Sequence, residues 1–226
     1  KVHLMNKVFF YLLLCVVSTA HSAINLGQTR VIYNENDKAA MFDVNNNTDK
    51  PYMVQTWLDK GNPDETPANL PMIITPPILK LDGHKSAGLR AIYQGNGLPH
   101  DVESVLWINV QEIPTIENEE NTLQLAQRIR IKLFYRPAGL NMTLPEAVEK
   151  LQWQCHGNTL RAVNPTPLHI SLTQLHINGQ NVDADMVNPH GERTFTLSQQ
   201  KVSHIDFNWV DDYGGTNAVN NVPISC

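Results

Sequence analysis

The sequence lacks the long apolar runs and the helical spacing that mark membrane-spanning or helical proteins. Its longest apolar run, Val8 to Val17, has about ten residues, whereas a membrane-spanning helix needs about 20. Apolar residues spaced three and four apart are almost absent, which argues against a helical bundle. Short apolar runs with alternating polarity dominate instead, and they favour an all-β fold.

The apolar run near the start is typical of a secretory signal peptide. A lysine, Lys7, precedes it, and the small residues Ala20 and Ser22 follow it, as signal-peptide cleavage requires. We therefore expect residues 1–22 to be removed and the mature chain to begin at Ala23. Residues 1–4 are expected to lie upstream of the true start at Met5. This segment predicts an exported protein that matures in an oxidising compartment.

A positive charge excess is also missing. Without Lys1 and Lys7, 15 basic residues face 22 acidic ones, so the mature chain is acidic and general nucleic-acid binding is disfavoured. Removing 22 of the 226 residues leaves 204, more than the usual single domain of about 100 to 150. Two domains of about 100 residues each are the first expectation.

Motifs for catalysis or cofactor binding are absent. The sequence contains no GxSxG, HExxH or CxxC motif and no phosphate-binding GK[ST] loop, so neither an enzyme nor a nucleotide, metal or other cofactor is expected. The histidines of the mature chain are scattered without metal-ligand spacing: His84, His100, His156, His169, His176, His190 and His204. A β-sandwich metalloenzyme stays a weaker alternative.

Cysteine is scarce: only Cys15, Cys155 and Cys226 occur. Cys15 leaves with the signal peptide, so an even pair remains in an oxidising compartment and predicts a Cys155–Cys226 disulfide. Two free thiols are the alternative.

The first half predicts seven strands in about 115 residues, which suits an immunoglobulin-like sandwich. The expected strands are Ile24–Tyr33, Ala39–Val44, Tyr52–Leu58, Met72–Leu81, Ala87–Tyr93, Ser104–Ile113 and Leu123–Tyr135. After Pro137, the segment Leu144–Val148 reads as a connector with one helical turn. We place the domain boundary there, giving domains 23–142 and 143–226.

The second half repeats this pattern and predicts a smaller sandwich. Its expected strands are Leu151–Cys155, Leu160–Val163, Leu168–Ile177, Arg193–Leu197, His204–Val210 and Val222–Cys226. Asn178-Gly179 predicts a hairpin turn after the third of them.

The most unusual segment runs from Thr122 to Pro137. Apolar residues dominate the odd positions from Leu123 to Tyr135, and Arg128, Arg130 and Lys132 occupy even ones. Fourteen alternating residues would span about 45 Å, whereas a typical strand has five or six residues. One interpretation is a long core strand with one face exposed to solvent. The other is an edge strand that overhangs its own sheet and pairs with a partner, or with a second copy of the free protein.

Several motifs in order make the chain resemble the periplasmic chaperones that assemble pili through an outer-membrane usher. The matching segments are Leu26–Tyr33, Pro76–Leu81, Glu103–Pro114, Ile131–Pro137, Asn164–Pro167 and Asp212–Gly215. The resemblance implies two immunoglobulin-like domains in a boomerang arrangement. It also implies a chaperone that binds, folds and caps pilus (fimbrial) subunits by donating an edge strand and then delivers them to the usher.

By motif position, the resemblance assigns residues to three roles. Arg30 and Lys132 would anchor the terminal carboxylate of the subunit. Glu103, Arg136 and Asp212 would form an ion network between the domains. The donor strand would present Leu123, Leu125, Gln127 and Ile129 to the subunit groove. Ile131 and Leu133 would pack in the core of their own domain. The short segment Thr115–Asn121 resembles the short-loop branch of the family.

A secreted adhesive or structural pilus module is the main alternative of another class. Such a subunit would be one incomplete domain with its own N-terminal extension, whereas this sequence predicts seven strands followed by a second domain.

Overall fold

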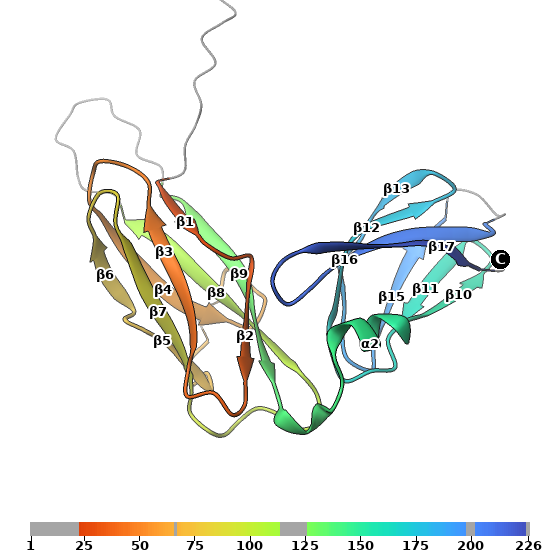
Figure 1. Cartoon of the computed structure of the whole chain (residues 1–226), viewed down its shortest axis with the longest axis horizontal. Coiled ribbons are helices and arrows are strands. Elements are labelled where there is room, and N and C mark those ends of the chain that lie inside the picture. Colours follow the sequence, from red (N-terminus) through yellow and green to blue (C-terminus); the bar gives the residue numbers. More distant parts are fainter. Residues whose placement is uncertain (1–22, 66, 114–125, 198–201, 225–226) are drawn as a thin grey trace, which may run out of the picture.

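The computed structural model describes residues 23–65, 67–113, 126–197 and 202–224. Two β-sandwich domains meet at an angle, like the arms of a V (Figure 1). The expected all-β class and the boomerang arrangement of two immunoglobulin-like domains are both confirmed.

The N-terminal domain consists of two facing sheets. One sheet has the order β1-β3-β7-β5 and the other has the order β2-β9-β8-β4-β6. Their strands are β1 (Ile24–Leu26), β2 (Arg30–Asn34), β3 (Ala40–Asn46), β4 (Tyr52–Asp59), β5 (Met72–Thr75), β6 (Ile78–Leu81), β7 (Ser86–Tyr93), β8 (Ser104–Ile113) and β9 (Arg128–Arg136). Among the described strands of this domain, β2 and β9 pair in parallel, and the other pairs are antiparallel.

Two predicted strands turn out to be two strands each, in different sheets. The run Ile24–Tyr33 breaks after Leu26, so that β1 pairs with β3 and β2 pairs with β9. The run Met72–Leu81 breaks at Pro76 and Pro77, which lack the backbone N–H that a sheet requires; β5 then pairs with β7 and β6 with β4. Each break lets one continuous run of sequence contribute a strand to each of the two sheets.

The C-terminal domain has a three-stranded sheet, β10-β11-β15, facing a second sheet built on β13-β12-β16-β17 with β14 also paired to β12. The strands are β10 (Gln152–His156), β11 (Thr159–Val163), β12 (Ile170–Ile177), β13 (Gln180–Asp183), β14 (Met186–Val187), β15 (Glu192–Thr196), β16 (His204–Val210) and β17 (Thr216–Pro223). The polar strand β13 and the short β14 were not predicted. The last strand begins at Thr216, so the predicted start at Val222 was wrong.

The connector and one hairpin follow the prediction. After a 3-10 turn at Ala138–Leu140, helix α2 (Leu144–Glu149) begins with a capping box between Thr143 and Glu146. Asn178 and Gly179 join β12 to β13, and both have the positive φ that a two-residue hairpin turn needs.

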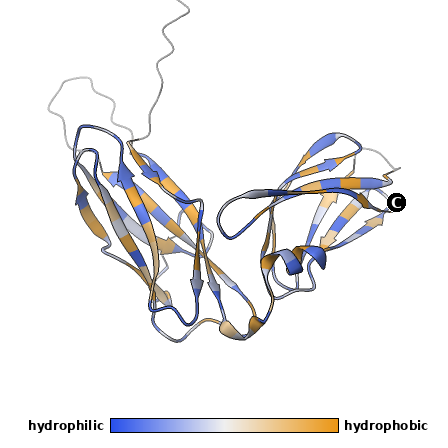
Figure 2. Ribbon diagram, viewed as in Figure 1, coloured by the Kyte–Doolittle hydropathy of each residue, from blue (hydrophilic) through white to orange (hydrophobic). Residues whose placement is uncertain are grey.

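Each domain has its own apolar core. Apolar and polar residues alternate along the strands of both domains (Figure 2), because successive side chains of a strand point to opposite faces. Ile131 and Leu133 lie in the N-terminal core. The residues that alternate with them along β9 therefore face away from this core.

One buried asparagine stabilises a loop in each domain by the same pattern of hydrogen bonds. The side-chain oxygen of Asn46 accepts from the backbone and hydroxyl of Thr48, and its amide donates to the carbonyl of Lys50. Asn164 does the same with Thr166 and Leu168. Because both side chains are fully enclosed, their satisfied polar groups fix the loop conformations.

Candidate functional site

The strand β9 is paired along both edges over only part of its length. On one edge, β8 pairs with it from Arg128 to Tyr135. On the other edge, β2 pairs with it only from Lys132 onward. Within the described residues, the β2-side edge of β9 from Arg128 to Ile131 therefore has no neighbouring strand.

Arg30 and Lys132 lie at the point where this pairing begins. Arg30 is the first residue of β2 and is directly opposite Lys132 in the parallel pair. Residues directly opposite each other in a sheet point to the same face, and the face in question is the one that turns away from the N-terminal core. The predicted anchor residues are thus neighbours at the end of an unpaired edge.

Arg30 is buried at the junction of the two domains. Its Nη1 donates to the carbonyl of Val210 at 3.1 Å, and its guanidinium lies 5.8 Å from the ring centre of Phe134. Its buried Nε has no hydrogen-bond partner in the described part of the chain. Desolvation lowers the pKa of Arg30, against the opposing effect of Asp212, Asp211 and Glu103.

Lys132 is half-buried beside Arg30. Desolvation lowers the pKa of its amine, and the positive charge of Arg30 lowers it further, while Asp185 acts in the opposite direction. Its Nζ lies 5.2 Å from the ring centre of Trp107.

Neither cation of this pair forms an ion pair with a described acidic residue, although both are partly removed from water. Two neighbouring positive charges with spare donors attract an anion, and a carboxylate can accept short, charge-assisted hydrogen bonds from both. The arrangement therefore suits a carboxylate at the end of a strand that pairs with β9.

The predicted donor strand is only partly described. Leu123 and Leu125 lie outside the described residues, as does the segment Thr115–Asn121, so their roles stay predictions. Gln127 is exposed and precedes β9, although its carbonyl still accepts a hydrogen bond from the backbone of Glu112. Ile129 is half-buried and packs against the core of its own domain.

Glu103, Arg136 and Asp212 are brought together across the domain junction. Arg136 contacts Glu103 at 2.8 Å within its own domain and Asp212 of the other domain at 2.6 Å. The second oxygen of Glu103 lies 2.9 Å from both the backbone nitrogen and the ring Nδ1 of His169 in the C-terminal domain. Burial alone would lower the pKa of Arg136, but its hydrogen bonds and charge interactions with Asp212 and Glu103 raise it overall.

A turn of the C-terminal domain adds a close backbone contact to this junction. Gly214 has a φ of +86°, and a Cβ at its position would lie 2.4 Å from the hydroxyl of Thr29. Only glycine permits this approach of the β16–β17 turn to the segment before β2. Beside it, a hollow of about 440 Å³ is lined by residues that include Arg30, Arg136 and Asp212.

Two family models match the chain, one for each domain. Residues 23–141 match the N-terminal domain, and residues 146–221 the C-terminal domain, of the PapD-type pili-assembly chaperones. The chain belongs to the pilus-assembly chaperone family.

Curated relatives agree with this assignment. The chain is 36% identical over 216 residues to the chaperone protein FimC of Escherichia coli K12, covering 93% of this chain and 88% of that protein. It is 38% identical over 225 residues to the chaperone protein MrkB of Klebsiella pneumoniae, covering 94% and 96%.

Solved structures agree as well. The E. coli chaperone DraB matches with a TM-score of 0.77 and 32% identity, over 89% of this chain and 96% of that chain. A Salmonella enterica structure of the SafA pilin in complex with the SafB chaperone matches with a TM-score of 0.80 and 26% identity, over 91% and 98%.

Other features of this pilus-assembly chaperone carry less functional information. Cys155 is disulfide-bonded, but Cys226 lies outside the described residues, so their pairing stays a prediction. Within the ranges described, no helix is long and apolar enough to cross a membrane, and no three histidine, cysteine or acidic side chains gather as a metal site.

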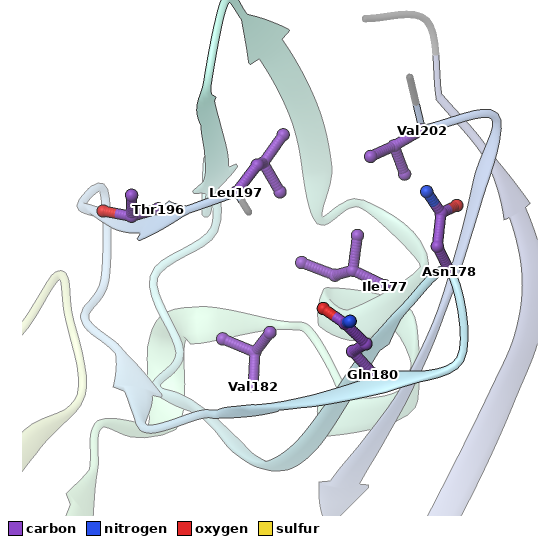
Figure 3. A pocket seen from close by; sticks show the side chains of 7 residues that line it. All are labelled: Ile177, Asn178, Gln180, Val182, Thr196, Leu197 and Val202. Carbon is purple, nitrogen blue, oxygen red and sulfur yellow. The ribbon is translucent and has the colours of Figure 1, made fainter. Parts of the chain in front are cut away.

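A small pocket in the C-terminal domain lies away from the anchor. It has a volume of about 30 Å³ and is lined by Ile177, Asn178, Gln180, Val182, Thr196, Leu197 and Val202 (Figure 3). That volume holds only one or two water molecules, so the pocket does not suit a ligand.

Two contributors to the site escaped the sequence analysis. His169 was counted among scattered histidines, yet it joins the ion network. Trp107 was only one residue of a strand motif, yet its ring contacts the cations of β9. Neither contact leaves a signal in the linear sequence, because both depend on which residues become neighbours between strands or domains.

Proposed function

We propose that this protein captures pilus subunits by lending them the unpaired edge of β9, with the terminal carboxylate of the subunit bound between Arg30 and Lys132. The observation that carries the proposal is the position of these two cations, directly opposite each other where β2 begins and the free edge ends.

This position also determines the direction of the bound strand. A subunit strand on the free edge would continue the line of β2, which runs parallel to β9. To place its terminal carboxylate at Arg30 it must end where β2 begins. It therefore runs parallel to β9, and the two cations set its register, which would otherwise be free to shift by two residues.

Apolar side chains supply the binding energy. We propose that Leu123 and Leu125 fill the groove of a subunit that lacks a strand, with Gln127 among them, and that the part of Ile129 left exposed by its own core adds to the same surface. Burying each leucine or isoleucine contributes about 2 kcal/mol before ordering costs. These residues, together with main-chain hydrogen bonds, suffice for tight binding without nucleotide hydrolysis or any other catalysis.

The cellular context completes the proposal. A cleaved signal peptide over residues 1–22 would deliver the chain to the periplasm, where the Cys155–Cys226 disulfide can form. The subunit would then pass to an outer-membrane usher. In the absence of a subunit, the same free edge can pair with that of a second copy.

Co-expression with a pilus subunit tests the anchor. Lys132→Ala and Arg30→Ala should fold normally and lose most of the co-purifying subunit. Arg128→Ala is the matched control, because Arg128 is an exposed cation on the same strand that is bonded only to the carbonyl of Pro63 among the described residues. Full subunit recovery with both anchor variants would contradict the proposal.

A further inference from the structure

A row of four residues crosses the outer face of the five-stranded sheet. Asp59 of β4 is opposite Trp107 of β8, Trp107 is opposite Lys132 of β9, and Lys132 is opposite Arg30 of β2. The anchor cations therefore form one end of the row and a buried carboxylate the other. The indole of Trp107 lies between them.

Trp107 contacts two cations at once. The guanidinium carbon of Arg130 lies 4.5 Å, and the amine of Lys132 5.2 Å, from its ring centre. Both distances are within the range in which the ring face attracts a positive charge. Unlike a carboxylate, the ring does not neutralise the amine or occupy all of its N–H donors.

The carboxylate of Asp59 is satisfied by partners other than Lys132. This carboxylate is fully buried and accepts hydrogen bonds from Arg130 at 2.7 and 3.3 Å, from Asn109 at 2.6 Å and from the backbone of Gly61 at 2.6 Å. Arg130 balances its charge and is held over Trp107 by the same bonds. The carboxylate nearest to the anchor along this row is thus already satisfied.

We propose that Trp107 is a positioning residue for Lys132, and that the Asp59–Arg130 pair holds the indole in place. This inference rests on the proposed function, because it matters only if Lys132 binds a carboxylate. The indole restricts the flexible side chain of Lys132 to the end of β2 where Arg30 lies, while the N–H donors of the lysine stay free. Less conformational freedom is then lost when the carboxylate binds.

A pair of synthetic peptides measures this effect. One peptide of alternating valine and threonine ends in a free carboxylate, and its twin ends in an amide. The wild-type protein should prefer the acid, and Trp107→Leu should reduce that preference about five- to tenfold. Trp107→Phe keeps an aromatic face and should retain most of it. Thermal unfolding of each variant shows whether the fold is intact.

A merely structural role for Trp107 gives a different result. Trp107→Leu would then weaken binding of the acid and the amide peptides by the same factor, or weaken neither. In both cases the preference for the acid stays as in the wild type, and that result overturns the inference. A ligand-free readout supports the comparison. The protons next to the Lys132 amine should show an upfield ring-current shift in NMR spectra of the wild type that Trp107→Leu removes; its absence from the wild type also overturns the inference.

Failure of the proposed function is distinguishable from failure of this inference. If the wild type binds neither peptide, or if Lys132→Met keeps the full preference for the acid, the anchor itself is wrong, and the positioning role falls with it. If Lys132→Met abolishes the preference but Trp107→Leu retains it, only the role of Trp107 is wrong.

Discussion

Arg30 and Lys132 lie directly opposite each other in the parallel pair of β2 and β9, at the residue where β2 begins. Two partly desolvated cations thereby mark the end of an unpaired strand edge. An edge alone would accept a strand in several registers. Under the proposed function, a carboxylate bound by the two cations would select one of these registers and would favour a chain terminus over an internal segment.

The donor strand gives the first prediction. Leu125→Glu should lower subunit capture strongly, because an apolar groove cannot solvate a carboxylate. Pull-down with a refolding subunit measures the effect. Gln124→Glu is the matched control, because it adds the same charge at the neighbouring position, which the alternation predicts to face the opposite side of the strand. Equal capture by both variants would show that this segment is not donated.

The ion network between the domains gives the second prediction. Glu103 is buried and joins Arg136 to His169, so Glu103→Gln leaves Arg136 incompletely paired. We expect a loss of about 2 to 3 kcal/mol in the free energy of unfolding, less than for a fully buried pair because Asp212 is partly exposed. Denaturant unfolding measures the stability, and small-angle scattering should show a wider range of interdomain angles.

The control for this network is the exposed pair of Arg161 and Glu192. Arg161→Gln should change stability by less than about 0.5 kcal/mol. If Glu103→Gln behaved like this control, the junction would be held by packing alone.

The sequence predicted the fold best where strands bury one face. Alternation located most of β3, β4, β7 and β8 because their apolar residues enter a core. It missed β13 (Gln180–Asp183) and the first part of β17 (Thr216–Pro223), whose residues are mostly polar and largely exposed. Exposed strands are held by backbone hydrogen bonds, which leave little trace in side-chain polarity.

The site was predictable only in part. Motif positions indicated Arg30 and Lys132, and the structure places them side by side. Trp107, Arg130 and Asp59 come from three strands, and their contacts arise from the register in which β4, β8 and β9 pair. Register is fixed by the whole sandwich, so no local pattern indicates these partners.

Acid should act on the Asp59 cluster. Desolvation opposes ionisation of Asp59, but hydrogen bonds from Asn109, Arg130 and Gly61 lower its pKa below the ordinary 3.8. A lowered folded-state pKa contributes stability above 3.8 that is lost as the pH falls through the lower folded-state pKa. The stability difference between wild type and Asp59→Asn should therefore be constant at neutral pH and shrink below about pH 4. Denaturant titrations across this range measure it.

A difference for Asp59→Asn that is equal at pH 3 and pH 7, values chosen to bracket the ordinary carboxyl pKa, would contradict the assignment.

The buried asparagine of the first domain gives a stability prediction. Asn46→Ala removes the groups that satisfy Thr48 and the carbonyls of Lys50 and Leu81. We expect a loss of about 2 to 3 kcal/mol, because the carbonyl of Leu81 and the backbone amide of Thr48 lose this hydrogen-bond partner in a buried setting. The neighbouring Asn47 has an exposed side chain, and Asn47→Ala should be nearly neutral by the same thermal unfolding assay.

Amide hydrogen exchange tests strand donation most directly. Residues 126–131 border the unpaired edge of β9, so their outward amides should exchange readily in the free protein and become protected when a subunit is bound. Lys132→Ala should lose this protection together with the subunit. A stable complex in which residues 126–131 exchange as fast as in the free protein would contradict the account, because the subunit would then be held elsewhere.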